Sequence, residues 1–200
     1  MNYSNNISTN IIRDDSKQID YVVTPNTKEI FDRIFVNNFG ANKSFSLIGN
    51  YGTGKSTFLW ALEKNLNKEK LFFNSLDSGQ EEVTGYDFIK IVGENSSLLD
   101  SLSKELKLKE GFDGSKLINA LEKKRIKSSK KNKGLVLIAD EFGKYLEHAS
   151  NKKSTDELYL IQQISEWAND DSNKTYFIIT LHQNFASYGK NLSNQDKLEW

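Results

Sequence analysis

A glycine-rich run offers the clearest chemistry in this chain. Residues 49–56 read Gly-Asn-Tyr-Gly-Thr-Gly-Lys-Ser and match G-x-x-x-x-G-K-S at every fixed position. A polyphosphate needs several backbone N–H groups pointing inward, and glycine tolerates the positive φ angles that such a tight loop demands. Lys55 could reach the terminal phosphates, and the Ser56 hydroxyl could ligate Mg²⁺. The predicted nucleotide-contacting residues are Gly49, Asn50, Tyr51, Gly52, Thr53, Gly54, Lys55, Ser56 and Thr57.

Two neighbouring carboxylates form the second candidate group. Asp140 and Glu141 directly follow the most hydrophobic stretch of the chain, residues 135–139. Ligands of open α/β sheets bind at the carboxyl ends of the strands, so these acids lie where a ligand is expected. We expect Asp140 to share Mg²⁺ with Ser56, and Glu141 to activate the water that attacks a γ-phosphate. A solvated strand end is the alternative, but the glycine-rich run favours hydrolytic chemistry.

A third polar group ends the apolar stretch 176–179. In P-loop ATPases that carry an acidic base beside the metal-binding Asp, a polar residue ends the strand between the two motif strands. That residue contacts the γ-phosphate or the attacking water. We expect this role of His182 or Gln183, or of the deeper Thr180. The alternative is that His182 only caps the strand or packs in the core.

Strands and helices must position these residues. An apolar run at 44–48 predicts a strand before the glycine-rich run, and a helical pattern continues to about residue 65. Thr24 and Pro25 are typical of a helix start, and Asn38 to Gly40 would end that helix. The remaining expectations are a strand at 71–73, a strand or short helix at 86–92, and helices at 98–106, from Ser115, and from 154.

The fold class follows from this alternation. The runs at 135–139 and 176–179 are apolar throughout, which is typical of strands buried on both faces of a parallel sheet. We therefore predict an α/β three-layer sandwich with a mainly parallel central sheet. Residues 1–20 are predicted to be a polar N-terminal arm, and residues 21–200 a single core domain. The stretch 195–200 resembles a helix cut in mid-turn, so we expect the chain to be the N-terminal part of a longer protein.

The amino-acid composition limits the partners and the location expected for the protein. Lys+Arg and Asp+Glu balance at 27 each, so net charge makes neither nucleic acid nor an acidic membrane an obligatory partner. The absence of cysteine excludes disulfides and thiolate metal sites. Residues 1–15 lack the apolar segment of a signal peptide, and no stretch is long and apolar enough for a membrane span. We expect a cytoplasmic protein without a membrane partner.

The three groups, in this order, resemble the AAA+ and STAND-type ATPases of the P-loop superfamily. The resemblance covers about residues 20–185. It implies a five-stranded parallel core in which the first motif strand, the polar-residue strand and the Asp-Glu strand are adjacent. It also implies ATP and Mg²⁺ as cofactors. More narrowly, residues 139–147 and 180–185 look like the N-terminal ATPase module of large bacterial NTPases, some of which act in defence against phage.

The chain departs from AAA+ proteins in two respects. It lacks their helical lid with its sensor arginine, and it offers no evident arginine finger, since Arg13, Arg33 and Arg125 are its only arginines. We therefore expect self-association, or a neighbouring subunit, to supply an arginine. A P-loop kinase is disfavoured because it would need several lid arginines.

The resemblance also suggests which base is bound. In such ATPases the segment before the first strand lines the adenine pocket, a location that Tyr21, Val22, Val23 and Pro25 match. These side chains could instead pack the first helix. A GTPase normally has Asn-Lys-x-Asp after a strand, and none of the five Asn-Lys pairs here is followed by Asp at that place. Adenine is therefore favoured over guanine.

Residues 123–133 form the one strong charge cluster, with seven cations and no acid. A nucleic-acid patch is one interpretation. A solvated face is favoured, because cations suit a helix C-terminus and no aromatics are interleaved.

Three functions remain open. The first is Mg²⁺-dependent ATP binding and hydrolysis that drives conformational change or remodelling. The second is a STAND-like nucleotide-binding switch or scaffold with slow turnover, and the third is a helicase-type, DNA-dependent ATPase. Glu141 favours hydrolysis, whereas the shortage of arginines favours the switch.

Overall fold

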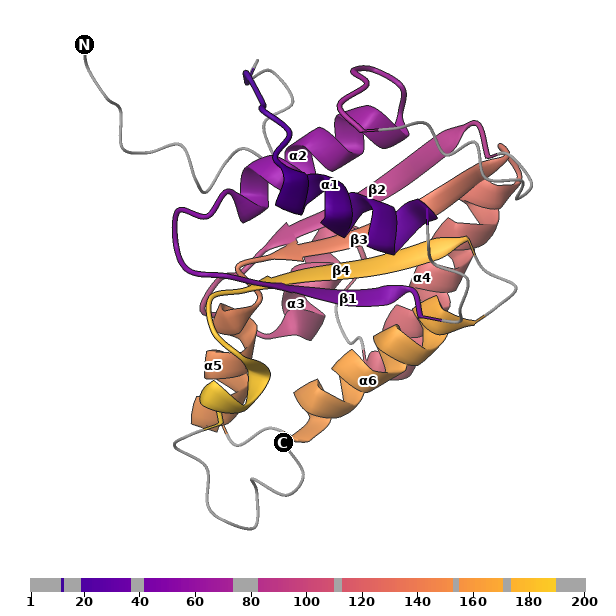
Figure 1. The fold of residues 1–200 in the computed structure, drawn as a ribbon. Coiled ribbons are helices and arrows are strands. Elements are labelled where there is room, and N and C mark those ends of the chain that lie inside the picture. Colours follow the sequence, from indigo (N-terminus) through magenta and orange to yellow (C-terminus); the bar gives the residue numbers. More distant parts are fainter. Residues whose placement is uncertain are drawn as a thin grey trace.

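The computed structural model describes residues 12, 19–36, 42–73, 83–109, 113–152, 155–170 and 174–189. They form an α/β domain in three layers (Figure 1). The strands are β1 (Ser44–Ile48), β2 (Gly85–Val92), β3 (Lys133–Asp140) and β4 (Thr175–Leu181). The helices are α1 (Pro25–Phe31), α2 (Lys55–Leu66), α3 (Leu98–Glu105), α4 (Gly114–Ser129), α5 (Gly143–Lys152) and α6 (Thr155–Asn169). A π-helical turn, Asp32–Val36, continues α1, and a 3₁₀ turn, Phe185–Ser187, follows β4.

All strand pairs are parallel, and the strand order is β1-β4-β3-β2. The α/β fold with a parallel sheet is thus confirmed, and the three motif strands are adjacent as the resemblance implied. The described residues form four strands, whereas the resemblance implied five. Because the strands are parallel, the carboxyl ends of β1, β3 and β4 lie at the same edge of the sheet, at the left of Figure 1.

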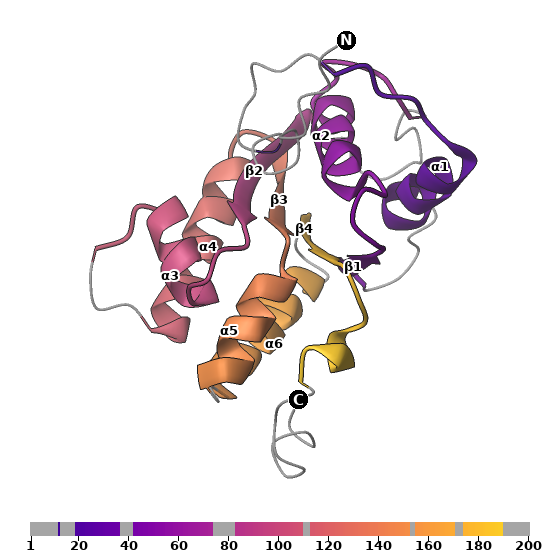
Figure 2. The same cartoon turned by 90° about the vertical axis from the view of Figure 1, so that its left-hand side faces the viewer.

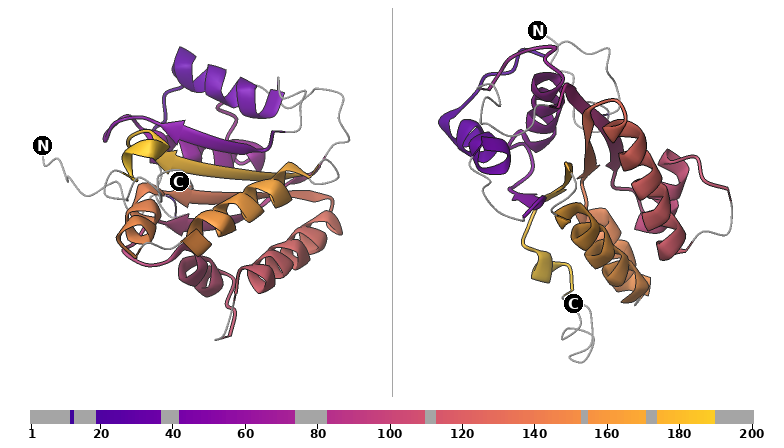
Figure 3. Two further views of the ribbon diagram at one scale, coloured as in Figure 1. Left: turned by 90° about the horizontal axis from the view of Figure 1, so that it is seen from below. Right: turned by 90° about the vertical axis from the view of Figure 1, so that its right-hand side faces the viewer.

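Helices cover both faces of the sheet, as two views turned by 90° show (Figures 2 and 3). α1 and α2 pack on one face, in a cluster that includes Phe31, Leu62 and Ile138. α3, α4, α5 and α6 pack on the other face, around Leu117, Leu137 and Ile164. Ile12, from the predicted arm, is 2% exposed and belongs to the first of these clusters.

The start of α1 forms as its residues predict. Thr24 is the N-cap, Pro25 is the first helical residue, and the side chains and backbones of Thr24 and Thr27 make a reciprocal capping box. Each hydroxyl satisfies an N–H group that would otherwise lack a partner at the helix start. The predicted end of this helix, Asn38 to Gly40, lies outside the described residues, as does the stretch 195–200.

The prediction of a strand at residues 71–73 was wrong. The backbone N–H groups of Phe72 and Phe73 both donate to Asn65 Oδ1, at 2.8 Å each, so this side chain replaces a neighbouring strand. Phe73 is instead anchored by its ring, which stacks on Phe31 with centroids 4.5 Å apart. Residues 86–92, left open between strand and helix, belong to β2.

Among the described residues, no helix has the length and apolar character needed to cross a membrane.

Candidate functional site

The glycine-rich run forms a loop between β1 and α2. Gly52 and Gly54 have φ angles of 79° and 83°, in the left-handed region that side chains disfavour. Gly54 is also the N-cap of α2, so the loop leads directly to the positive end of that helix. Lys55 Nζ donates to the carbonyl oxygens of Gly49 (2.5 Å) and Asn50 (2.9 Å), and so lies across the loop. Burial lowers the pKa of Lys55, and the negative charges of Asp140 and Glu141 partly oppose this.

Ser56 and Asp140 meet at the expected place. The Ser56 hydroxyl donates to Asp140 Oδ2 at 2.7 Å, so the start of α2 is tied to the end of β3. A hydroxyl and a carboxylate are hard oxygen donors, and Mg²⁺ is held in proteins by one or two carboxylates together with substrate phosphates. Among the described residues no group of three or more His, Cys, Asp or Glu side chains could hold a metal. The hydroxyl of Ser56 and the carboxylate of Asp140 fit a Mg²⁺ ion whose other ligands are phosphate oxygens and water.

Thr180, the deepest of the three sensor candidates, contacts both acidic residues. Its hydroxyl donates to Asp140 Oδ1 at 2.5 Å and accepts from the Glu141 backbone N–H at 2.9 Å. Its carbonyl oxygen accepts from Phe142 N at 2.9 Å, and the residue is fully buried. Both functions of the hydroxyl are therefore used within the protein, which makes Thr180 a positioning residue for Asp140 and Glu141.

Glu141 has an unusual backbone and an unexpected partner. Its φ angle is +51°, a conformation that costs a non-glycine residue roughly 1–2 kcal/mol. The carbonyl of Glu141 lies close to β2, where a Cβ at Gly93 would come within 2.1 Å of it, so only glycine fits there. The Glu141 carboxylate forms an ion pair with Lys144 on α5, at 2.5 Å, and this contact raises the pKa of Lys144.

His182 lies beside the loop. Its ring stacks on the ring of Tyr51, with centroids 3.4 Å apart and planes 21° apart, and its Nδ1 is 3.3 Å from Lys55 Nζ. Burial and then the charge of Lys55 lower the pKa of His182. A neutral ring that accepts from Lys55 at Nδ1 carries its proton on Nε2, which is buried with no hydrogen-bond partner among the described residues.

The backbone of His182 is also fixed. Its N–H donates to the Tyr188 hydroxyl at 3.2 Å. The Tyr188 ring packs so closely on Gly143 that a Cβ there would lie 2.4 Å from the hydroxyl. Gln183, the third sensor candidate, is exposed.

A cavity of about 390 Å³ opens beside the glycine-rich loop, between α1, β1 and α2. Its wall includes Thr27, Ile30 and Arg33 from α1 and the turn after it, and Lys55 and Phe58 from α2. None of Tyr21, Val22, Val23 and Pro25 lines it. The Tyr21 ring packs edge-on against the Phe72 ring, with centroids 5.4 Å apart.

The two described arginines occupy different places. Arg33 lines the cavity just named, whereas Arg125 forms a bidentate ion pair with Glu122 on α4. Arg13 lies outside the described residues.

Sequence reasoning missed Lys144, Gly93 and Tyr188. Lys144 stands three residues after Glu141, a spacing at which side chains of one helical turn meet, so it could have been found. Gly93 directly follows an apolar strand, a weaker signal of close backbone approach. Nothing in the sequence indicates the contact of Tyr188 with His182.

Comparisons with known proteins show the family of the chain and structures with the same fold. Residues 23–181 match the family model described as the KAP family P-loop domain. Two structures of the ORC2 protein of Aeropyrum pernix share the fold. For the ADPNP–ADP complexes the TM-score is 0.59 at 18% identity, over 94% of this chain and 49% of that one. For the ADP form the TM-score is 0.57 at 20% identity, and the match covers 94% of this chain and 50% of that one. The chain thus spans about half the length of these structures, and no curated protein matches it.

Proposed function

Because the chain belongs to the KAP family of P-loop domains, and is therefore a P-loop NTPase domain, we propose that it binds ATP with Mg²⁺ and hydrolyses it. The observation that carries this proposal is the 2.7 Å contact between Ser56 Oγ and Asp140 Oδ2 at the mouth of the glycine-rich loop. It brings the two residues of a metal–phosphate site together from elements 84 residues apart.

Each residue has a distinct task in this proposal. The loop N–H groups and Lys55 bind the phosphates, and Lys55 exchanges its bonds to Gly49 and Asn50 for phosphate oxygens. Ser56 and Asp140 would hold Mg²⁺, and the ion would offset the charge that develops on the phosphates. Glu141 accepts the proton of the attacking water, and Thr180 fixes the positions of Asp140 and Glu141.

His182 is the proposed sensor. Its Nδ1 lies 3.3 Å from Lys55 Nζ, and departure of Lys55 to a phosphate would free this nitrogen. The Tyr51 ring would move with the loop, so nucleotide entry would also alter the stack. Gln183 is the second candidate for the sensor, since its side chain is exposed beside His182 in the sequence.

Adenine is the proposed base, and the cavity beside α1 is its proposed site. This cavity joins Lys55 and Gly49 of the loop to the apolar side chains of Ile30 and Phe58, which suits a flat aromatic base next to a phosphate. Since Arg125 is held by Glu122, we propose that the arginine completing the active site comes from another subunit.

A switch with slow turnover is the second candidate, and the Glu141–Lys144 ion pair favours it. The ion pair occupies the carboxylate that must accept the proton of water, so water activation requires this pair to open. The domain would then hold ATP until a partner releases Glu141.

Calorimetric titration with ATP tests the proposal. We expect the wild-type chain to bind ATP more tightly with Mg²⁺ than with EDTA, Asp140→Asn to lose this difference, and Lys55→Ala to lose binding. The matched control is Lys64→Ala, on α2 but away from the loop. Binding by Lys55→Ala at wild-type affinity would remove the site from the glycine-rich loop.

A further inference from the structure

The edge of the sheet opposite the glycine-rich loop carries a dense set of cations, here called the basic edge. It comprises Lys123 and Lys127 on α4, Lys130 and Lys131 just after that helix, Lys133 at the start of β3, and Lys174 before β4. The first four side chains are exposed. This edge lies at the right of Figure 1, where α4 leads into β3. Lys174 is distant in sequence and reaches the edge because its carbonyl accepts from Leu135 N on the adjacent strand, at 2.9 Å.

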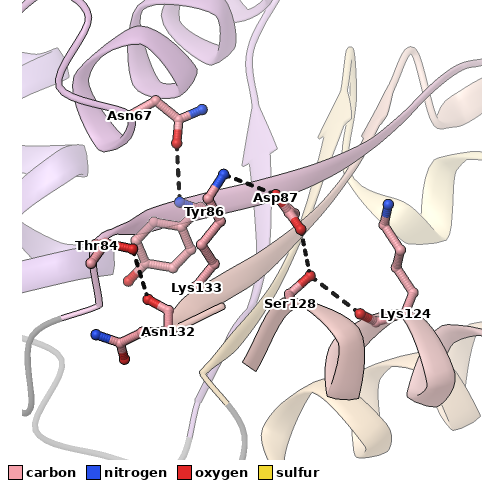
Figure 4. A network of polar contacts seen from close by, with 8 residues as sticks. All are labelled: Asn67, Thr84, Tyr86, Asp87, Lys124, Ser128, Asn132 and Lys133. Atoms are coloured by element: carbon pink, nitrogen blue, oxygen red, sulfur yellow. Dashed lines mark hydrogen bonds and ion pairs between the residues drawn. The ribbon is translucent and has the colours of Figure 1, made fainter. Parts of the chain in front are cut away.

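A network of hydrogen bonds fixes this edge in place (Figure 4). Ser128, at the end of α4, donates to Asp87 Oδ2 on β2 at 2.8 Å, and Lys133 Nζ donates to Asp87 Oδ1 at 3.2 Å. After the helix, the Asn132 carbonyl accepts from Thr84 N at 2.8 Å. These bonds tie the end of α4 and the turn after it to β2, so the backbone that carries the exposed lysines is held in place.

Two carboxylates at this edge, those of Asp87 and Glu122, are already engaged. Burial would raise the pKa of Asp87, but the hydrogen bonds from Ser128 and Lys133 outweigh it, and the pKa lies below its ordinary value. Glu122 binds Arg125 through two hydrogen bonds, at 2.6 and 2.8 Å. Within the described part of the chain, none of the four exposed lysines has a carboxylate within ion-pair distance.

The stability of α4 alone does not explain why four exposed lysines cluster at this edge. Lys123 and Lys127 are four residues apart on α4, a spacing at which like charges on a helix repel. Only cations in the last turn gain from the helix dipole, and Lys123 lies before that turn. The four lysines thus form a surface whose repulsion a polyanion would relieve.

We propose that the basic edge binds the phosphate backbone of nucleic acid without reading its sequence. Lys123 and Lys127 lie about 6 Å apart along the axis of α4, Lys131 lies in the turn that follows, and duplex DNA carries a negative charge every ~1.7 Å. A recess of about 190 Å³ at the same edge is lined by Arg125, Ser129, Asn132, Lys133 and Lys174, so further N–H and O–H donors lie next to the lysines. A lipid surface fits less well, because Ile126, at 41% exposure, is the one large apolar side chain exposed among the described residues of α4.

The test is fluorescence anisotropy with a labelled DNA duplex of about 20 base pairs, in the absence of nucleotide. The variant is the triple change Lys123→Gln, Lys127→Gln and Lys131→Gln. Its matched control is Lys104→Gln, Lys109→Gln and Lys152→Gln, which removes three equally exposed lysines elsewhere. ATP titration of each protein checks that its fold is intact.

We expect the wild-type chain and the control to bind the duplex with affinity that falls steeply with salt. The variant should bind at least about tenfold more weakly at low salt, with a salt slope shallower by about 0.9 for each lost phosphate contact. No duplex binding by the wild type, or equal losses in variant and control, would overturn the proposal. Vesicles of phosphatidylglycerol and phosphatidylcholine are tested in parallel, and lysine-dependent binding to vesicles without binding to DNA would also overturn it. Since no nucleotide is present, neither result depends on ATP hydrolysis.

Discussion

Lys144 Nζ lies 2.5 Å from Glu141 Oε2, so the carboxylate proposed to activate water is held in an ion pair. The two residues are three apart, and Glu141 adopts a left-handed conformation just before α5 begins. The pair therefore depends on the turn that connects β3 to α5. Its opening is the step at which hydrolysis could be regulated.

Replacing Lys144 should raise the rate of hydrolysis. In Lys144→Gln the Glu141 carboxylate loses its ion-pair partner, so it is free to accept the proton of water. A partly exposed ion pair is worth up to ~1 kcal/mol, which corresponds to an increase in kcat of at most about fivefold. Steady-state phosphate release measures this, with Lys152→Gln on the same helix as the control. A fall in kcat would instead show that Lys144 assists hydrolysis.

Replacing Thr180 should slow hydrolysis without abolishing ATP binding. Thr180→Val keeps the side-chain shape but leaves Asp140 Oδ1 without its donor and Glu141 N–H without its acceptor. We expect kcat to fall at least about tenfold, and the Mg²⁺ concentration for half-maximal activity to rise. The loss of stability should be ~1–3 kcal/mol, because buried polar groups lose their partners.

Thr180→Ser is the control for this prediction. It keeps the hydroxyl and should restore most of kcat and of the Mg²⁺ dependence. If Thr180→Ser were as slow as Thr180→Val, the methyl group rather than the hydroxyl would be the important feature.

The pKa of His182 should depend on Lys55. Burial and the Lys55 charge both hold this pKa below its ordinary value of 6.5. Removing a neighbouring positive charge favours the imidazolium form, so in Lys55→Ala the pKa of His182 should rise toward that value. Histidine NMR titration measures it, and His148→Gln assigns the signals, since the chain has two histidines. An unchanged or lower pKa would show that the two side chains do not interact in solution.

The sequence predicted the phosphate loop, the acidic pair and their strands because each rests on local signals. Residues 49–56 carry a fixed pattern of glycines, and the unbroken apolar runs before Asp140 and before Thr180 predict buried parallel strands. The adjacency of these strands followed from the resemblance, and the sheet order confirms it.

The features that the sequence could not predict depend on contacts between residues that are not neighbours in the sequence. Asn65 takes the place of a strand partner for residues 72 and 73, and no local pattern distinguishes those residues from a strand. The different contacts of Thr180 and His182 depend on how deeply each side chain is buried. Although the two residues are only two positions apart, the Thr180 hydroxyl is buried against Asp140 and the His182 ring lies beside Lys55. Lys174 joins the basic edge only through the order of the strands.

Phosphate release by Glu141→Gln, under single-turnover conditions with saturating Mg²⁺ and ATP, tests the central claim most directly. The amide cannot accept a proton from water, so we expect binding close to that of the wild type and a rate lower by about 100-fold or more. Binding is measured in the same samples by fluorescent ATP. A wild-type rate of phosphate release in Glu141→Gln would contradict the assignment of Glu141 as the base, and with it the hydrolytic centre proposed at the ends of β1, β3 and β4.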